Sequence, residues 1–213
     1  MLTFSKPNKK LQKLQKRLNL RRCELWSFDL PPTITCNPSC KFRAIAANGK
    51  LYKAMKNGYP SCYAARSDAF YPNCQIMRAR NYATLLASQD MSKTIETSIP
   101  KTAKVIRLHT SGDFFSYDYM LAWYKVAQNN PKLIIYAYTK QVSFLLKLRK
   151  LGLPKNLRIV CSYGSDSDRL ITRYNLPWAQ AIPKEKTKEY KSITINNDDY
   201  PAYMGKCSII IYH

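Results

Sequence analysis

A chain of 213 residues can bury a core without disulfide cross-links and is short enough to form a single domain. Its 35 Lys and Arg residues stand against 13 Asp and Glu, and the formal net charge of +22 favours a polyanionic partner. We expect double-stranded DNA. An anionic membrane is the rival, but no apolar run approaches the ~20 residues that span a bilayer. The basic start of the chain also lacks the apolar segment of a signal peptide, so we expect a soluble cytosolic protein.

Residues 1–24 form a basic arm in this interpretation. Leu11, Leu14 and Leu18 recur at helical spacing among lysines and arginines, which predicts a short amphipathic helix with a cationic face. Such a face is often only solvated, and the alternative is contact with phosphates. The residues that we expect to contact nucleic acid, in the arm and beyond it, are Lys13, Arg17, Arg21, Arg78 and Arg107.

The next part of the chain, residues 30–75, carries cysteines and has no clear periodicity. It follows a predicted strand, Leu25–Leu30, which Pro31 and Pro32 end. Gln75–Ser88 then predicts a helix. The apolar face of that helix would consist of Ile76, Ala79, Ala83 and Leu86.

Strands and helices alternate regularly from Val105 onward, inside an α/β core that we place at residues 76–213. The alternation implies parallel strands joined by right-handed crossover helices. The expected strands are Val105–Thr110, Leu133–Tyr138 and Leu157–Tyr163, and the expected helices are Tyr117–Gln128 and Val142–Leu151. A polar strand at Ser192–Ile195 and a last strand within Cys207–His213 complete the prediction.

Each of the three central strands ends in a polar cluster. The clusters are His109–Asp113, Tyr138–Lys140 and Ser162–Asp168. Parallel strands share a carboxyl end, so the three clusters should lie on one rim of the sheet. Ligands of α/β proteins bind at such a rim, and we predict the active face there.

The chemistry at this rim would rest on carboxylates, because the chain has only two histidines. Asp113, Asp166 and Asp168 stand at the strand ends. Paired carboxylates suit attack and proton transfer at an acetal carbon, and they equally suit binding of Mg²⁺ for phosphodiester cleavage. The alternative for each aspartate is a helix cap or a local hydrogen bond to the backbone.

Side chains beside Asp113 are candidates for substrate contact. Ser111 and Gly112 are small enough to let a sugar or base approach the backbone, and a rim tyrosine could stack on a base. Arg107 and a rim lysine would supply positive charge. The complete set predicted to bind substrate is His109, Ser111, Gly112, Phe114, Tyr138 and Lys140.

Four of the seven cysteines lie in the irregular region, as a C-x3-C pair at Cys36 and Cys40 followed by Cys62 and Cys74. Thiolates are soft ligands that suit zinc or iron–sulfur clusters. Zinc is the first expectation, with Cys74 or His109 completing four ligands. A three-cysteine cluster with an open iron is the second. Buried hydrophobic thiols without a metal are the alternative to both.

Several segments together carry a resemblance to a known family. They are Leu30–Cys36 with Cys40, Ser61–Ala64, Tyr71–Asn73, Arg78 with Asn81, His109–Phe115 and Tyr136–Lys140. In combination they resemble the phage proteins called gene product 88. Members of that family are similar to phage transglycosylases that exchange guanine in DNA for a 7-deazaguanine, which protects viral DNA from host restriction. Those enzymes are related to the queuine tRNA transglycosylases, which have a (β/α)8 barrel and a zinc site.

The resemblance implies a DNA guanine transglycosylase that works in the host cytoplasm with a 7-deazaguanine base as co-substrate. Asp113 would match the strand-end acid that attacks C1′ of a flipped nucleotide, and Asp166 or Asp168 would move protons. Cys36, Cys40 and Cys62 would match the metal-binding cysteines. A full barrel needs ~250 residues, so this chain would form a reduced or incomplete TIM-like barrel.

Three other functions stay open from the residues alone. A metal-dependent nuclease would use the same carboxylates with Mg²⁺, and EDTA would abolish its nicking of plasmid DNA. A non-enzymatic DNA-binding protein would show steeply salt-dependent binding and leave nucleosides unchanged. A radical enzyme would carry an open iron–sulfur cluster, which metal analysis under anaerobic conditions would detect.

Overall fold

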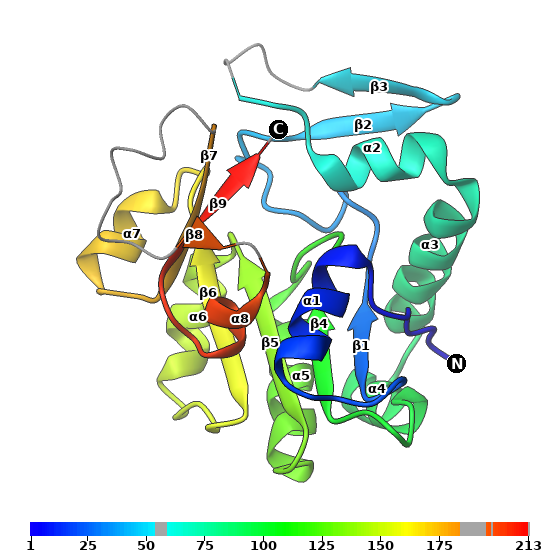
Figure 1. Cartoon of the computed structure of the whole chain (residues 1–213), viewed down its shortest axis with the longest axis vertical. Helices are drawn as coiled ribbons and strands as arrows, with labels where there is room; N and C mark the ends of the chain where they lie inside the picture. Colours follow the sequence, from blue (N-terminus) through cyan, green and yellow to red (C-terminus); the bar gives the residue numbers. More distant parts are fainter. Residues whose placement is uncertain (54–58, 184–194, 197, 213) are drawn as a thin grey trace.

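A computed structural model describes residues 1–53, 59–183, 195–196 and 198–212 and shows an α/β protein (Figure 1). The main sheet has seven strands in the order β1-β4-β5-β6-β7-β9-β8, and neighbouring strands in it are parallel. These strands are β1 (Leu25–Phe28), β4 (Val105–Leu108), β5 (Ile134–Thr139), β6 (Leu157–Ser162), β7 (Trp178–Pro183), β8 (Ile195–Asn196) and β9 (Ser208–Tyr212). A separate antiparallel hairpin consists of β2 (Ala44–Ala47) and β3 (Lys50–Lys53).

The helices occupy the connections between strands and the region before β1. They are α1 (Lys9–Arg17), α2 (Tyr63–Phe70), α3 (Pro72–Leu86), α4 (Met91–Ser98), α5 (Tyr117–Asn129), α6 (Val142–Arg149), α7 (Asp168–Arg173) and α8 (Tyr200–Tyr203). No helix in these described ranges is long and apolar enough to cross a membrane.

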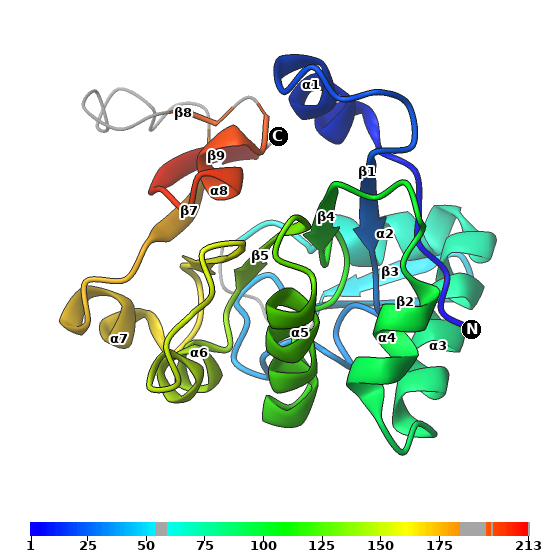
Figure 2. The ribbon, with the colours of Figure 1, turned by 90° about the horizontal axis from the view of Figure 1, so that it is seen from below.

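The strand order explains how the helices are distributed. From β1 through β4, β5 and β6 to β7 the sheet advances in one direction along the chain. Right-handed crossovers then place successive helices on the same face, and α4, α5 and α6 lie together there (Figure 2). The helices α1 and α8 lie on the opposite face (Figure 2). The described strands leave the sheet open between its edges β1 and β8, so the parallel sheet with crossover helices is confirmed but a TIM-like barrel is not shown.

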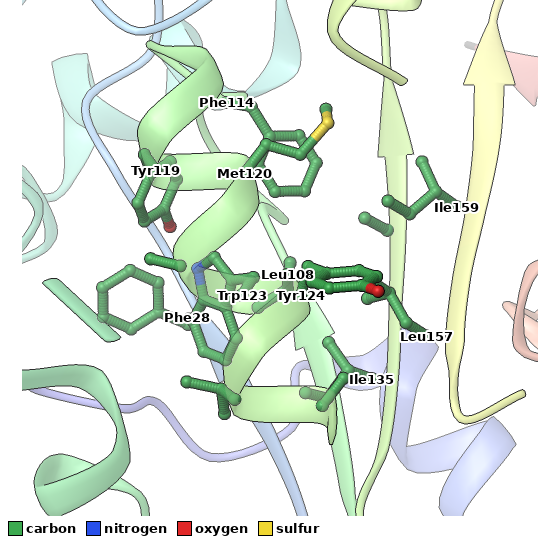
Figure 3. Close-up of a cluster of buried hydrophobic side chains, with 14 of the residues drawn as sticks. Phe28, Leu108, Phe114, Tyr119, Met120, Trp123, Tyr124, Ile135, Leu157 and Ile159 are labelled. Carbon is green, nitrogen blue, oxygen red and sulfur yellow. The ribbon is translucent and has the colours of Figure 1, made fainter. Parts of the chain in front are cut away.

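The larger core lies between the sheet and α5 (Figure 3). Trp123 of α5 is fully buried, and its ring lies 5.7 Å from that of Phe28 in β1. All four residues of β4 are buried, as expected for a central strand of a parallel sheet that is covered on both faces. Ser116 begins α5 by accepting a hydrogen bond from the Tyr119 N–H at 3.1 Å, which is a regular helix cap.

The second core lies on the face covered by α1. Leu11 and Leu14 of α1 are buried with Val105 of β4 and Tyr136 of β5. Asn8 caps this helix, since its Oδ1 accepts a hydrogen bond from the Leu11 N–H at 3.0 Å. The predicted amphipathic helix is therefore confirmed, but its apolar side is part of the core and the segment is not a free arm.

The predicted helix at Gln75–Ser88 is confirmed as α3, whereas its predicted apolar face is wrong. The structure buries Arg78 and Asn81 and leaves Ile76 47% and Leu86 60% exposed. Arg78 forms a buried ion pair with Asp68 of α2. The Asn81 side chain bonds the backbone of residues 3 and 29. These polar partners turn the helix so that its hydrogen-bonding side faces inward.

The strands and helices predicted between Val105 and Tyr163 are all confirmed, with ends that differ by a few residues. The last predicted strand is confirmed as β9. Of the polar strand predicted at Ser192–Ile195, residues 192–194 lie outside the described residues, and Ile195 begins the two-residue strand β8.

Candidate functional site

The three polar clusters that follow β4, β5 and β6 meet on one rim of the sheet, as the parallel pattern predicts. The Asp113 carboxylate, after β4, accepts hydrogen bonds from the Thr139 hydroxyl at 2.6 Å and the Lys140 N–H at 2.8 Å, at the end of β5. The Lys140 Nζ donates to the Ser162 hydroxyl at 2.6 Å and to the Tyr163 carbonyl at 2.9 Å, at the end of β6. A continuous chain of hydrogen bonds therefore joins the three strand ends.

Asp113 is the centre of this chain and is only 5% exposed. Its third hydrogen bond comes from the Phe114 N–H at 2.8 Å. Burial raises the pKa of Asp113 above its usual value, while the bonds from Thr139, Lys140 and Phe114 act in the opposite direction. The carboxylate thus holds the β4 loop against β5, and in this conformation its oxygens are occupied by the protein's own donors.

The loop that carries Cys36 and Cys40 is fastened over the same rim. The Asn37 side-chain amide donates to the Lys140 carbonyl at 2.9 Å, and the Lys41 N–H donates to the Gly164 carbonyl at 2.9 Å. Asn37 also accepts from the Ser39 N–H at 2.9 Å, a local turn that Asn favours. Side chain and backbone together therefore tie the loop to the ends of β5 and β6.

Cys36, Cys40 and Cys62 come together above the rim. All three are partly buried and none forms a disulfide. Burial raises the pKa of Cys36, and the nearby charges of Asp113, Cys62 and Cys40 raise it further. Burial and the charges of Cys62 and Asp113 likewise raise the pKa of Cys40, against the lowering effect of Lys140 and a backbone hydrogen bond. The thiols of Cys36, Cys40 and Cys62 are thus close enough to influence one another.

These thiols are not arranged around a single metal ion. Among the described residues, no three Cys, His, Asp or Glu side chains stand close enough to hold one. With Zn–S bonds of about 2.3 Å, tetrahedral zinc needs sulfurs about 3.8 Å apart. An iron–sulfur cluster is larger and is held by thiolates that lie farther apart. The thiols of Cys36, Cys40 and Cys62, as placed in this structure, therefore form no closed zinc site.

Neither predicted fourth ligand joins the three thiols. Cys74 lies in the first turn of α3, and the eight residues of α2, about 12 Å of helix, separate it from Cys62. His109 is buried in the core, where its Nε2 lies 3.0 Å from the Tyr119 hydroxyl. The predicted four-ligand set that includes Cys74 or His109 is therefore not assembled.

Four of the residues predicted to bind substrate have structural roles. Burial and, second, the charge of Arg107 lower the pKa of His109 to about 3, so it is a neutral core residue. Phe114 is fully buried in the same core. Ser111 is 2% exposed and donates its hydroxyl to the Leu30 carbonyl at 2.9 Å. These side chains are buried in this structure, and their contact with a substrate stays a prediction.

Gly112 has the positive φ of +85° that favours glycine, but the space beside it is filled by the chain itself. A Cβ there would lie 2.7 Å from the Thr35 hydroxyl and 2.8 Å from the Leu30 Cβ. In this structure the glycine lets the β1 and β4 loops pack together, and its predicted role in admitting a sugar or base stays a prediction. Tyr138 and Lys140, the other two predicted contacts, remain partly exposed near the rim.

The two aspartates after β6 differ in their surroundings. Asp168 accepts hydrogen bonds from the Gly164 and Ser165 N–H groups, each at 3.0 Å, and so fixes the turn that precedes α7. Asp166 is exposed, and its N–H donates to the Ser39 hydroxyl at 3.1 Å. Asp168 thus has the backbone-capping role that was the alternative for it, whereas the Asp166 side chain is accessible at the rim.

The predicted nucleic-acid contacts divide into exposed and buried groups. Lys13, Arg17 and Arg21 are exposed on α1 and just after it, and the Arg17 guanidinium lies 3.7 Å from the centre of the Tyr200 ring. Arg78 is buried in its ion pair with Asp68, and Arg107 is buried against Asp199 at 2.9 Å. Arg78 and Arg107 thus pair with acids inside the protein, and only the three exposed residues are accessible to phosphates in this structure.

Two residues of the rim were not predicted. Asp29, directly after β1, is 4% exposed and accepts hydrogen bonds from the Thr110 hydroxyl at 2.7 Å and the Ser111 N–H at 3.1 Å. Tyr63, directly after Cys62, donates its hydroxyl to the Thr110 carbonyl while its ring stays 68% exposed. The strand-end position that drew attention to Asp113 would also have identified Asp29. Tyr63 belongs to the Ser61–Ala64 segment of the family resemblance, but nothing in its local pattern indicates a place at the rim.

A hollow of about 710 Å³ lies elsewhere, at the amino ends of β5 and β6. Its lining includes Lys132, Ile134, Pro154, Lys155 and Arg158. This is the edge opposite the thiols, so the hollow is separate from the candidate site.

The fold and the rim define an α/β protein with an open parallel sheet and a set of three cysteines above its carboxyl edge. The gene product 88 family model matches residues 2–208, so the chain belongs to that family. The Gene 88 protein of Mycobacterium phage L5 is 32% identical over 95 residues, an alignment that covers 43% of this chain and 36% of that protein. Both matches support a bacteriophage origin. No solved structure matches the chain.

Proposed function

We propose that this protein is an iron–sulfur enzyme whose cluster is held by Cys36, Cys40 and Cys62 and leaves one iron open to a small ligand. The observation that carries the proposal is that Cys36, Cys40 and Cys62 lie near one another above the carboxyl rim, where the Cys62 N–H donates to the Phe42 carbonyl at 2.8 Å. Neither Cys74 nor His109 joins them in this structure. A structural zinc site closes with four ligands, whereas a cluster with three thiolates keeps one position open for chemistry.

The surroundings of the thiols support a catalytic site more than a structural one. Ligands of α/β proteins bind at the carboxyl ends of parallel strands, which is where the cysteine loop is fastened. Lys140 lies close enough to Cys40 to favour its thiolate, as a site with several anionic sulfurs requires. An open cluster of this kind, with a bound cofactor such as S-adenosylmethionine, supplies radical chemistry.

The chain's own residues would position and shield that chemistry. Asp113 and Lys140 hold the ends of β4, β5 and β6 in one arrangement beneath the thiols. Tyr63 and Asp166 are exposed beside the cysteine loop and are available to a substrate. The net charge of +22 favours nucleic acid as that substrate.

Cluster assembly under anaerobic conditions tests the proposal. The purified protein is supplied with iron and sulfide, and bound iron, bound sulfide and visible absorption are measured. We expect a cluster in the wild type and in Cys74→Ala, and none in the triple variant of Cys36, Cys40 and Cys62 to Ala. Iron and sulfide retained by the triple variant, or zinc bound with a requirement for Cys74, would contradict the proposal.

Guanine exchange in DNA is the second candidate, with Asp113 as the nucleophile and a 7-deazaguanine as the incoming base. The observation in its favour is a carboxyl group at the end of β4, beside Cys36. It requires Asp113 to leave its hydrogen bonds with Thr139 and Lys140. Incubation with DNA and labelled 7-deazaguanine tests it. No incorporation by the wild type, or full incorporation by Asp113→Ala, would refute it.

A further inference from the structure

Exposed aromatic rings are concentrated next to the cysteine site. Four of the five exposed aromatic side chains among the described residues are Tyr52, Tyr63, Phe70 and Tyr71, and the fifth is Tyr174. Three of the four belong to α2 or its last cap, where Tyr63 and Phe70 are each 68% exposed and Tyr71 is 62% exposed. A group of exposed apolar rings is typical of a surface that meets a partner.

The region around these rings is positively charged and contains almost no acidic residues. Residues 30–89 contain a single acid, Asp68, and eight basic residues. That acid is buried in its ion pair with Arg78. Lys50, Lys53 and Arg66 are exposed on the hairpin and on α2, which pack against each other. A second copy of the chain would bring the same charge to this surface and be repelled, whereas a polyanion would be attracted.

The exposed side of α2 alternates aromatic rings and charge along one line. Tyr63, Arg66 and Phe70 follow the i, i+3, i+7 spacing of a single helix face, and Tyr71 follows directly. Eight helical residues span about 12 Å, which corresponds to about three nucleotides at 3.4 Å each. The line starts at the rim, because Tyr63 follows Cys62 and is bonded to the Thr110 carbonyl (Figure 1 shows α2 beside the hairpin).

We propose that this α2 face, made of Tyr63, Arg66, Phe70 and Tyr71, binds unpaired nucleotides of a nucleic acid and leads the strand toward the thiols. The rings would stack on bases, which requires bases that are not paired within a duplex. Arg66 and the lysines of the hairpin would contact the phosphates. This inference rests on the proposed function in one respect: the strand is expected to run toward the thiols because the reaction is proposed to take place there.

Fluorescence anisotropy with a labelled oligothymidylate, and with a duplex of the same length, measures the binding. We expect tighter binding to the single strand. The double variant Phe70→Ala/Tyr71→Ala should weaken single-strand binding by about tenfold or more. Tyr174→Ala is the matched control, because Tyr174 is also exposed at 48% and also lies beside an arginine, and it should bind like the wild type.

A salt series and a conservative variant complete the test. Arg66→Gln should reduce the slope of log affinity against log salt by about 0.7, whereas Lys155→Gln, on the opposite edge, should not. Phe70→Trp keeps a ring for stacking and should retain binding, which excludes misfolding as the cause of a loss. Equal binding by the wild type and the Phe70→Ala/Tyr71→Ala variant, a preference for duplex, or capture of a protein through this face in place of nucleic acid would each overturn the proposal.

The binding assay needs no metal and is done on metal-free protein. A chain that assembles no cluster but still binds single strands through α2 would refute the iron–sulfur proposal alone. A chain that assembles a cluster but binds without Phe70 and Tyr71 would refute the α2 face alone.

Discussion

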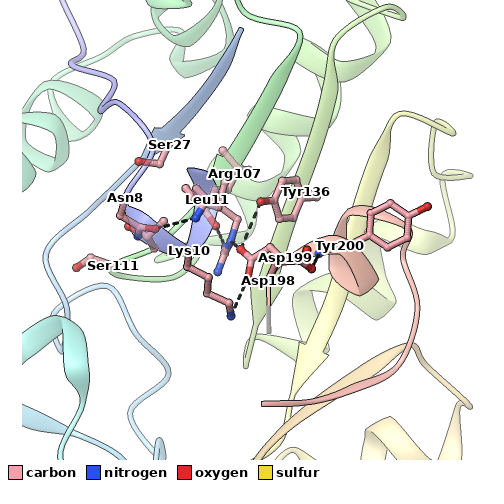
Figure 4. Close-up of polar contacts among 12 residues, drawn as sticks. Asn8, Lys10, Leu11, Ser27, Arg107, Ser111, Tyr136, Asp198, Asp199 and Tyr200 are labelled. Atoms are coloured by element: carbon pink, nitrogen blue, oxygen red, sulfur yellow. Dashed lines mark hydrogen bonds and ion pairs between the residues drawn. The ribbon is translucent and has the colours of Figure 1, made fainter. Parts of the chain in front are cut away.

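A buried ion-pair network ties α1, β4 and the start of α8 together (Figure 4). Asp199 is 4% exposed; its Oδ2 accepts from the Arg107 Nε at 2.9 Å, and its Oδ1 lies 2.9 Å from the Lys10 Nζ. The Oδ1 contact lacks good hydrogen-bond geometry, and Lys10 is 37% exposed, so Arg107 is the main partner. We predict that Asp199→Asn destabilises the protein strongly, because it leaves the Arg107 guanidinium buried without a counter-charge.

The size of the expected loss of stability follows from the burial of both Arg107 and Asp199. Breaking a buried pair by removing one charge costs about 3–5 kcal/mol, against a total stability of about 5–15 kcal/mol. For a chain of this length each kcal/mol lowers the melting temperature by about 2–4 °C, so a fall of about 6–20 °C is expected. Asp198→Asn is the matched control, since its partner Arg17 is 53% exposed at a distance of 3.4 Å, and a pair with one exposed partner is worth at most about 1 kcal/mol. Replacing the whole pair, with Arg107→Met and Asp199→Leu, should recover most of the loss.

The same ion-pair network predicts that the stability of the protein depends on pH. Burial alone would raise the pKa of Asp199, but the charges of Arg107 and Lys10 outweigh it and lower the pKa. An acid with a lowered pKa in the folded state stabilises the fold above its unfolded pKa, about 4, and loses this effect as the pH falls below it. Thermal denaturation followed by circular dichroism should therefore show a large difference between wild type and Asp199→Asn at pH 7 that shrinks below about pH 4. A loss under 1 kcal/mol at pH 7, or a double variant no more stable than the single one, would refute the reasoning.

Three further substitutions test the rim and its support. Gly112→Ala should lower the melting temperature by several degrees more than Gly152→Ala, because both have a positive φ but only the first Cβ would meet other atoms within 4 Å. Asp113→Asn should lower the free energy of unfolding in urea by about 1–3 kcal/mol, since an amide cannot accept all three hydrogen bonds. His109→Asn, which tolerates φ of +62°, should reduce the loss of stability between about pH 6.5 and 3. The folded pKa of about 3 makes the unfolded chain bind this proton first, so an unchanged pH slope would exclude a neutral buried His109.

The regular half of the fold was predictable because its signals are local. Runs such as Val105–Leu108 combine β-branched and apolar residues, and Tyr117–Asn129 repeats apolar residues at helical spacing. Parallel strands then force their ends onto one rim, so the meeting of Asp113, Lys140 and Ser162 followed from the pattern alone. This step needed no knowledge of tertiary contacts.

The region between β1 and β4 was not predictable in the same way. The residues of α2 show no apolar face, since Ala64 and Ala65 are buried while Tyr63 and Phe70 are exposed. Without this helix in view, Cys74 looked like a neighbour of Cys62. The orientation of α3 likewise depended on long-range partners of Arg78, which periodicity cannot report.

For the individual site residues, the place in the chain was predictable but the direction of the side chain was not. Position in the sequence placed His109 and Phe114 next to Asp113, but these residues lie beyond the end of β4 in an irregular segment, where His109 has a φ of +62° and Gly112 a φ of +85°. The direction of each side chain there does not follow from its position in the sequence. The structure sends His109 and Phe114 into the core beneath α5, while Asp113 faces the end of β5. The sequence pattern thus predicts which residues lie near the rim, but it does not predict which of their side chains point toward it.

The order of the strands in the sheet explains why the cysteine loop lies over the carboxyl rim. Because the crossover helices share one face, the other face of the sheet is free, and α1 and α8 fill it (Figure 2). The carboxyl rim between these two layers is covered by the loop of Cys36 and Cys40, which is bonded to the ends of β5 and β6 but follows β1. A group bound by these thiols would therefore be held by the connection after β1 and braced by two other strand ends. Under the two proposals made above, that arrangement would hold the bound group rigidly on the protein side and would leave α2 as its exposed approach.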